Sequence, residues 1–120
     1  MQNIYEQNII DNYKNPINFG KPQVFNKSGR FANLSCGDEI NVYLTIDSNN
    51  ILTDLKFTGS GCSLTIATMS IASEKIMGKS IDEILKLEYS DFIDFIGVTP
   101  NPARSKCVLT GMEAIRDALK

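Results

Sequence analysis

The sequence has 120 residues, 42% of them hydrophobic and 22% charged, so it can build one compact core and is not a disordered chain. Its 12 basic and 14 acidic residues give a formal net charge of −2, which argues against nucleic-acid binding. No apolar run approaches the roughly 18 residues of a membrane span, and the first residues hold no apolar signal core. We therefore expect one cytoplasmic domain over residues 1–120 with no membrane partner. The absence of histidine from the sequence excludes Ser-His-Asp triads, Cys-His dyads and histidine-containing zinc sites.

The first half of the chain predicts one helix followed by strands. Residues 3–13 have helical periodicity and lead into a loop rich in proline and glycine. A weak strand is predicted over residues 25–33. Residues 40–46 alternate apolar and polar side chains, and residues 51–57 do so in part. The polar segment 47–50 between them is typical of a hairpin turn.

After Gly61 the periodicity becomes helical. Residues 63–77 predict a helix that is apolar around much of its circumference, and residues 80–87 and 90–96 predict two short helices. The last helix is expected from about residue 105 to 119. One face of it carries only small side chains, at Cys107, Gly111, Ala114 and Ala118, which predicts a close helix–helix seam. The order of helix, strands and helices predicts the α+β class.

Three cysteines stand at junctions rich in glycine, serine or charge rather than inside apolar runs: Cys36, Cys62 and Cys107. Their odd number and wide spacing argue against a disulfide framework. Cys36 and Asp38 are two residues apart at the start of a strand-like segment, so their side chains share one face. Local chemistry leaves two interpretations open: a shared metal or thiol site, or separate buried cysteines beside a solvated or capping carboxylate.

Two of these thiols are expected to favour the thiolate. Cys62 and Cys107 each precede or open a predicted helix, whose N-terminus carries partial positive charge. Arg104 and Lys106 add positive charge next to Cys107. Three thiolates and one carboxylate would suit tetrahedral zinc or an iron–sulfur cluster. Because a carboxylate is a harder ligand than a thiolate, such a cluster would be held loosely, which favours a scaffold over an electron carrier.

Several motifs occur in a specific order along the chain: YKNPINFG at 13–20, CGD at 36–38, GC at 61–62, GKS at 78–80 and KC at 106–107. Over about residues 4–119 the chain resembles the NifU/IscU family of iron–sulfur cluster assembly scaffolds. The resemblance implies an N-terminal helix, a small three-stranded antiparallel sheet and a cluster of helices packed on it, in one domain like the N-terminal domain of NifU.

The resemblance also implies a site and a reaction. Cys36, Asp38, Cys62 and Cys107 would bind iron or a labile [2Fe-2S] cluster, or Zn²⁺ in a resting form. Cys107 would accept sulfur as a persulfide from a pyridoxal-phosphate-dependent cysteine desulfurase, with Lys106 as an auxiliary residue. The cluster would then pass to apo iron–sulfur acceptor or carrier proteins. The protein would be a scaffold rather than an enzyme.

Two departures leave the branch of the family open. Where the IscU branch has histidine before the last cysteine, this chain has Lys106, and residues 98–104 replace the Leu-Pro-Pro-Val-Lys segment that docks a dedicated Hsp70 chaperone. Docking of that chaperone is therefore not expected. A basic residue before the last cysteine is more like the SufU branch, but the long insertion of that branch between its last two cysteines is absent. The alternative function is a zinc-bound, SufU-like sulfurtransferase that accepts persulfide and activates a desulfurase.

Overall fold

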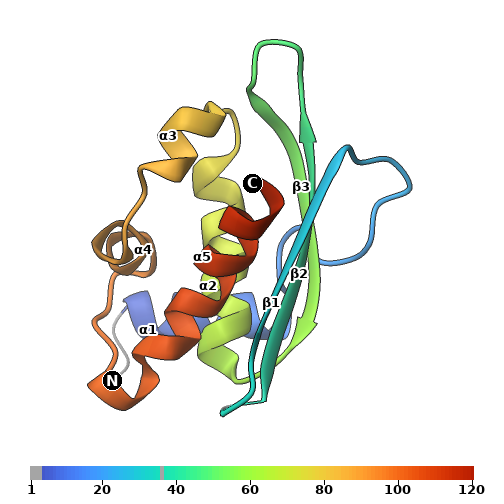
Figure 1. Cartoon of the computed structure of the whole chain (residues 1–120). Helices are drawn as coiled ribbons and strands as arrows, with labels where there is room; N and C mark the ends of the chain where they lie inside the picture. Colours follow the sequence, from blue (N-terminus) through green and yellow to red (C-terminus); the bar gives the residue numbers. More distant parts are fainter. Residues whose placement is uncertain (1–3, 36) are drawn as a thin grey trace.

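A computed structural model describes residues 4–35 and 37–120 of the chain. It has a helix, an antiparallel sheet and then helices, as the sequence predicts (Figure 1). The elements in chain order are α1 (Ile4–Lys14), β1 (Lys27–Asn33), β2 (Asp38–Ile46), β3 (Leu52–Ser60), α2 (Ser63–Ile76), α3 (Ile81–Leu85), α4 (Tyr89–Ile96), the 3-10 helix η1 (Pro102–Arg104) and α5 (Ser105–Ala118). None of the described helices is both long and apolar enough to cross a bilayer.

The sheet has the strand order β1-β2-β3, and each neighbouring pair is antiparallel. Every second residue of the central strand β2 is buried, which is the predicted period of two. Figure 1 shows α2 and α5 lying against one face of the sheet, so the alternating apolar side chains of β2 and β3 form the core with these helices. The strand predicted to end at residue 57 continues to Ser60, which brings the chain to the edge where α2 begins.

The small-residue face of α5 packs against two different elements. A Cβ atom added to Gly111 would lie 2.9 Å from the sulfur of Met69 in α2, so this part forms the predicted helix–helix seam. Ala114 and Ala118 instead pack against Gly29 of β1, where a Cβ atom would overlap the backbone of α5. The prediction of one continuous helix–helix seam was therefore wrong for the second half of α5. The small side chains also serve to bring the helix onto a strand.

Helix α1 packs on the core through Ile9 and is also joined to α2 by polar groups. Asn12 is its one buried residue, and its Oδ1 accepts a 2.6 Å hydrogen bond from the hydroxyl of Ser70. The backbone N–H of Ile17 donates to the same hydroxyl oxygen at 2.8 Å. Tyr5 packs on Gly97, and the side chains of Tyr5 and Tyr13 are both exposed. The predicted helix exists over Ile4–Lys14, and its one buried residue is polar.

Candidate metal centre

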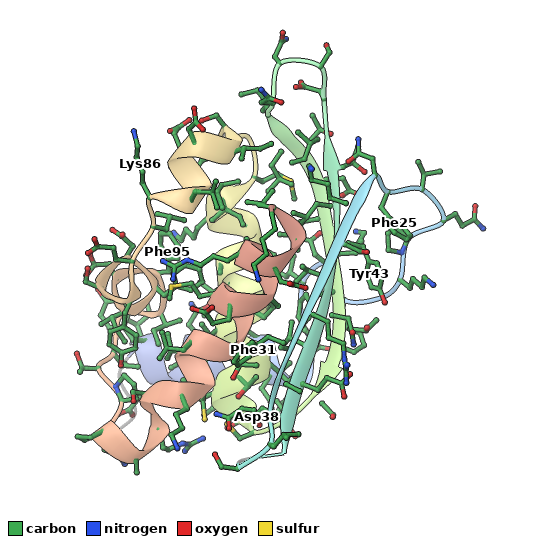
Figure 2. All side chains as sticks on the ribbon, in the orientation of Figure 1. Phe25, Phe31, Asp38, Tyr43, Lys86 and Phe95 are labelled. Atoms are coloured by element: carbon green, nitrogen blue, oxygen red, sulfur yellow. The ribbon has the colours of Figure 1, made fainter. Side chains whose placement is uncertain are left out.

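Three of the four predicted ligands meet at one end of the sheet. Asp38 opens β2, Cys62 is the residue before α2, and Cys107 lies in the first turn of α5. One carboxylate oxygen and the two sulfur atoms lie within 4.8 Å of one another, and the sulfurs are 3.1 Å apart. Figure 2 labels Asp38 at this end of the sheet. Cys36, the fourth predicted ligand, lies outside the described residues.

Hairpin pairing and a glycine bring Asp38 to Cys62. The pairing of Glu39 with Ser60 places the start of β2 beside the end of β3. At the next position, a Cβ atom on Gly61 would lie 2.5 Å from Oδ1 of Asp38, so only glycine leaves room for the carboxylate there. That oxygen accepts a 3.1 Å hydrogen bond from the backbone N–H of Cys62. The carboxylate thus occupies the N-terminal end of α2, where negative charge is favoured.

Thr65 links the carboxylate to one of the thiols. Its hydroxyl donates a 2.9 Å hydrogen bond to Oδ2 of Asp38 and lies 3.3 Å from the sulfur of Cys62. The side chains of Thr65 and Asp38 are both buried. One hydroxyl carries one proton, so it can donate to the carboxylate or to an ionised Cys62, but not to both at once. The two acidic groups are therefore coupled through this residue.

The two thiols have opposite pKa shifts. Burial opposes ionisation of Cys62, but hydrogen bonds from Thr65 and Cys107 outweigh it and lower the pKa of Cys62 to about 7. Burial and the neighbouring Cys62 thiolate raise the pKa of Cys107 to about 11. The two sulfurs are 3.1 Å apart, within hydrogen-bond distance, and once Cys62 is ionised only the S–H group of Cys107 can donate in this contact. In the metal-free protein, one thiol of the pair therefore ionises near neutral pH and the other stays protonated.

The expectation that both thiols favour the thiolate holds for Cys62 and was wrong for metal-free Cys107. Cys107 is only 5% exposed and lies beside a second acidic thiol, and these two effects exceed that of the helix N-terminus. The ammonium group of Lys106 approaches the hydroxyl of Ser35 at 3.5 Å. The cation that interacts with the sulfurs is the guanidinium of Arg104. Hydrogen bonding to Cys62, and to a smaller extent to Cys107, raises the pKa of Arg104.

The donor set fits a thiophilic metal ion. Zinc–sulfur bonds are about 2.3 Å long, so two sulfurs that share an ion lie within about 4.6 Å of each other. The separation of Cys62 and Cys107 meets this condition. Two sulfurs and one carboxylate oxygen supply three of the four ligands of a tetrahedral site, and they suit zinc or iron better than magnesium or calcium.

Sequence reasoning missed Thr65, which contacts these ligands, and identified Arg104 only in part. Thr65 stands three positions after Cys62, the spacing at which side chains in the first helical turn reach back to the helix cap, and this spacing could have identified it. Arg104 was expected to add positive charge at Cys107, but its guanidinium acts on Cys62 more than on Cys107. It stands three positions before Cys107, and the 3-10 turn that directs it toward the sulfurs left no clear pattern in the sequence.

Comparison with known proteins gives relatives of two kinds. The chain is 34% identical over 119 residues to the iron-sulfur cluster assembly enzyme IscU of Drosophila melanogaster, which covers 97% of this chain and 76% of the relative. It is 35% identical to the zinc-dependent sulfurtransferase SufU of Bacillus subtilis, covering 96% and 88%. That second alignment spans 134 positions, more than the whole length of this chain, so SufU contains residues that this chain lacks.

Solved structures and a family model agree with the fold. A protein from Fervidobacterium islandicum AW-1, described as an iron-sulfur cluster assembly scaffold for the SUF system, matches with a TM-score of 0.79 at 30% identity, covering 95% of each chain. The N-terminal part of a NifU-like protein from Brucella abortus matches in fold, with a TM-score of 0.78 at 19% identity, over 97% of this chain and 92% of the other. The family model of the NifU-like N-terminal domain matches residues 4–120, and the chain belongs to this family.

Proposed function

We propose that this protein is a single-domain scaffold for iron–sulfur cluster assembly. The observation that carries the proposal is the convergence of one buried carboxylate and two thiols from three separate elements, at Asp38, Cys62 and Cys107. We include Cys36 as the fourth ligand, because it stands two residues before Asp38 in the sequence. Iron and the [2Fe-2S] cluster are cargo in this function. The mixed ligand set favours release, because a carboxylate is a poorer partner for cluster iron than a thiolate.

Sulfur would arrive as the outer atom of a persulfide on a pyridoxal-phosphate-dependent cysteine desulfurase. The thiolate of Cys107 attacks that outer sulfur, a new S–S bond forms at Cys107, and the S–S bond of the donor breaks. The donor cysteine leaves as a thiolate, so charge is conserved and no external oxidant or reductant is needed. A completed cluster would pass to apo acceptor or carrier proteins.

The high pKa of Cys107 sets a condition for this step. Burial raises that pKa, and the adjacent Cys62 thiolate and the charge of Asp38 add to the effect. A cation held by those same two groups offsets their negative charge and favours the thiolate of Cys107. Arg104 contributes positive charge to both sulfurs, whereas the ammonium group of Lys106 contacts Ser35 and would act as an auxiliary residue.

Zinc-dependent sulfur transfer is the second candidate function. The 35% identity to SufU of B. subtilis and the presence of Lys106 before the last cysteine favour it. In this function Zn²⁺ would rest on the same ligands, and Cys107 would accept persulfide and so increase desulfurase turnover. The ligand set fits zinc as well as iron, since sulfur and oxygen donors both occur in zinc sites.

Anaerobic reconstitution with ferrous iron, cysteine and a cysteine desulfurase separates the two functions. A scaffold gives a cluster that absorbs visible light and moves to an apo acceptor protein. A sulfurtransferase stimulates the desulfurase strongly without forming a stable cluster. Cys107→Ser should abolish sulfur labelling of this protein in either case, and persistent labelling of that variant would show that another cysteine is the acceptor.

A further inference from the structure

Sulfur that arrives as a persulfide has to be reduced before it can enter a cluster. A cluster contains its sulfur as sulfide, whereas the outer sulfur of a persulfide is still bonded to a second sulfur atom. A thiolate that attacks the inner sulfur breaks this bond and releases the outer atom as hydrosulfide. In the proposed function the inner sulfur is Sγ of Cys107, so the attacking group has to reach this atom.

Cys62 is close enough to make this attack. Its sulfur lies 3.1 Å from that of Cys107, and an S–S bond is about 2.05 Å long, so the two atoms have to approach by only about 1 Å. Cys62 and Cys107 are the two free thiols in residues 4–35 and 37–120. The hydroxyl of Thr65 also lies near, 3.3 Å from the sulfur of Cys62, but a hydroxyl is a much weaker nucleophile than a thiolate. Cys62 is therefore the nucleophile that the described residues offer.

The surroundings of Cys62 favour a reaction over a static contact. Its backbone N–H is held by Oδ1 of Asp38 at 3.1 Å, and the residue precedes α2 in an extended conformation. Its half-buried side chain can therefore turn toward Cys107 without disturbing a helical turn. Thiol exchange spreads negative charge over three sulfur atoms, and the guanidinium of Arg104, which interacts with both cysteines, would stabilise that charge.

We propose that Cys62 is the residue that releases sulfide from a persulfide on Cys107. This inference rests on the proposed function. The thiolate of Cys62 attacks Sγ of Cys107, an S–S bond forms between the two cysteines, and the bond to the outer sulfur breaks. The outer sulfur keeps its proton and the electron pair of the broken bond, so it leaves as hydrosulfide and charge is conserved. A dithiol protein or a low-molecular-weight thiol then reduces the new disulfide and restores both ligands.

A metal ion on Cys62 should prevent this attack, because the ion occupies the electron pair that the thiolate would use. Zinc-loaded protein should therefore keep a persulfide on Cys107. Removal of the zinc should start the release of sulfide, which gives the reaction a defined starting point.

The test starts from zinc-loaded wild type that a pyridoxal-phosphate-loaded cysteine desulfurase has charged with sulfur at Cys107, with the desulfurase and free cysteine then removed anaerobically. A chelator is added to free Cys62, and hydrosulfide and protein mass are followed. We expect one hydrosulfide for each persulfide lost, and a protein that is lighter by one molecule of hydrogen sulfide. Non-reducing tryptic mapping identifies the disulfide, because cleavage after lysine and arginine places the three cysteines in separate peptides, residues 31–56, 57–75 and 107–116. The map should join Cys62 to Cys107.

Two variants test the role of the attacking thiol. Cys62→Ser removes it, so release of hydrosulfide should be at least about 100-fold slower, because a nucleophile held in place reacts much faster than one from solution. Ser63→Ala is the matched control, since this neighbouring side chain is exposed and both thiols remain, and it should release hydrosulfide at the wild-type rate. The disulfide map of the wild type decides the matter even if Cys62→Ser takes up no sulfur.

The inference is overturned if, after zinc is removed, the outer sulfur stays on Cys107, moves to Cys62 as a second persulfide, or leaves as Cys107 forms a disulfide with Cys36. In each of these cases the desulfurase has still charged Cys107, so the proposed function stands. If the desulfurase leaves no persulfide on Cys107 of the wild type, the proposed sulfur-accepting step fails and the inference fails with it.

Discussion

Replacing Thr65 with valine should disrupt the link between the carboxylate and the thiol without changing the volume of the core. The hydroxyl is fully buried and donates to Oδ2 of Asp38 at 2.9 Å. A hydrogen bond to a charged group contributes about 1.5–3 kcal/mol, and its loss leaves a buried carboxylate oxygen unsatisfied. We expect Thr65→Val to lower the free energy of unfolding by that amount. We also expect Thr65→Val to raise the pKa of Cys62 above about 7, because the hydrogen bond with Thr65 lowers that pKa more than any other contact does.

The neighbouring Thr68 provides a matched control. It lies in the same helix and is 1% exposed, but its hydroxyl has no hydrogen-bond partner among the described residues. Thr68→Val removes a buried polar atom that makes no bond, so it should leave stability unchanged or raise it by about 1 kcal/mol. Urea unfolding of metal-free protein measures both variants. Equal effects of Thr65→Val and Thr68→Val would refute the hydrogen-bond assignment, whereas restored stability in Thr65→Ser would support it.

Three further predictions concern the thiols, the close contact at Gly61 and helix α1. In metal-free protein, iodoacetamide should alkylate Cys62 faster as the pH rises through about 7, and Cys107 only near about pH 11, because the thiolate is the reactive form. Peptide mapping measures the order of modification, and finding Cys107 modified first at about pH 7 would contradict the prediction. Gly61→Ala should weaken zinc binding roughly 10- to 100-fold, because its methyl group would displace the carboxylate of Asp38. The control Ser60→Ala should bind zinc as the wild type does. Equal zinc affinities of the two variants in chelator competition would contradict this steric account. Asn12→Ala should lower the free energy of unfolding by about 1–3 kcal/mol and speed amide hydrogen exchange across α1. Unchanged exchange would show that the contact between Asn12 and α2 does not hold the helix in place.

Hydrophobic periodicity predicted most of the helices and strands, because each of them has to turn its apolar side chains toward the core. The alternation in β2 appears directly as alternating burial, since one face of the sheet packs on helices. The spacing of Ser80 and Glu83 is typical of a capping box, and both hydrogen bonds of that box are present at the start of α3. Such local patterns depend on few neighbours, so they can be identified from the sequence.

Features that depend on distant parts of the chain were predicted less well. The small face of α5 gave no sign that its second half packs on Gly29, because a strand and a helix both accept small side chains. The anchoring of α1 by Asn12 likewise depends on a hydroxyl 58 residues away. Hydrophobic periodicity is uninformative where the contact between two helices is polar.

The candidate site was only partly predictable for the same reason. Spacing and family motifs predicted Asp38, Cys62 and Cys107 as ligands, and the structure brings these three side chains together. Their order of acidity could not be read from neighbouring residues. It depends on Thr65 and on the distance between two sulfurs that are 45 positions apart in the chain. Helix position and nearby basic residues predicted a thiolate at both cysteines, and this holds for Cys62 alone of the two.

Cobalt substitution tests most directly whether these groups hold one ion. Co²⁺ occupies sulfur-rich zinc sites, and each bound thiolate adds charge-transfer absorption that the free protein lacks. Anaerobic titration of the wild type should saturate at one equivalent, and Cys62→Ser and Cys107→Ser should each lose part of that absorption while Ser60→Ala keeps it all. Absorption that is unchanged in both cysteine variants would show that the two sulfurs do not share a metal ion.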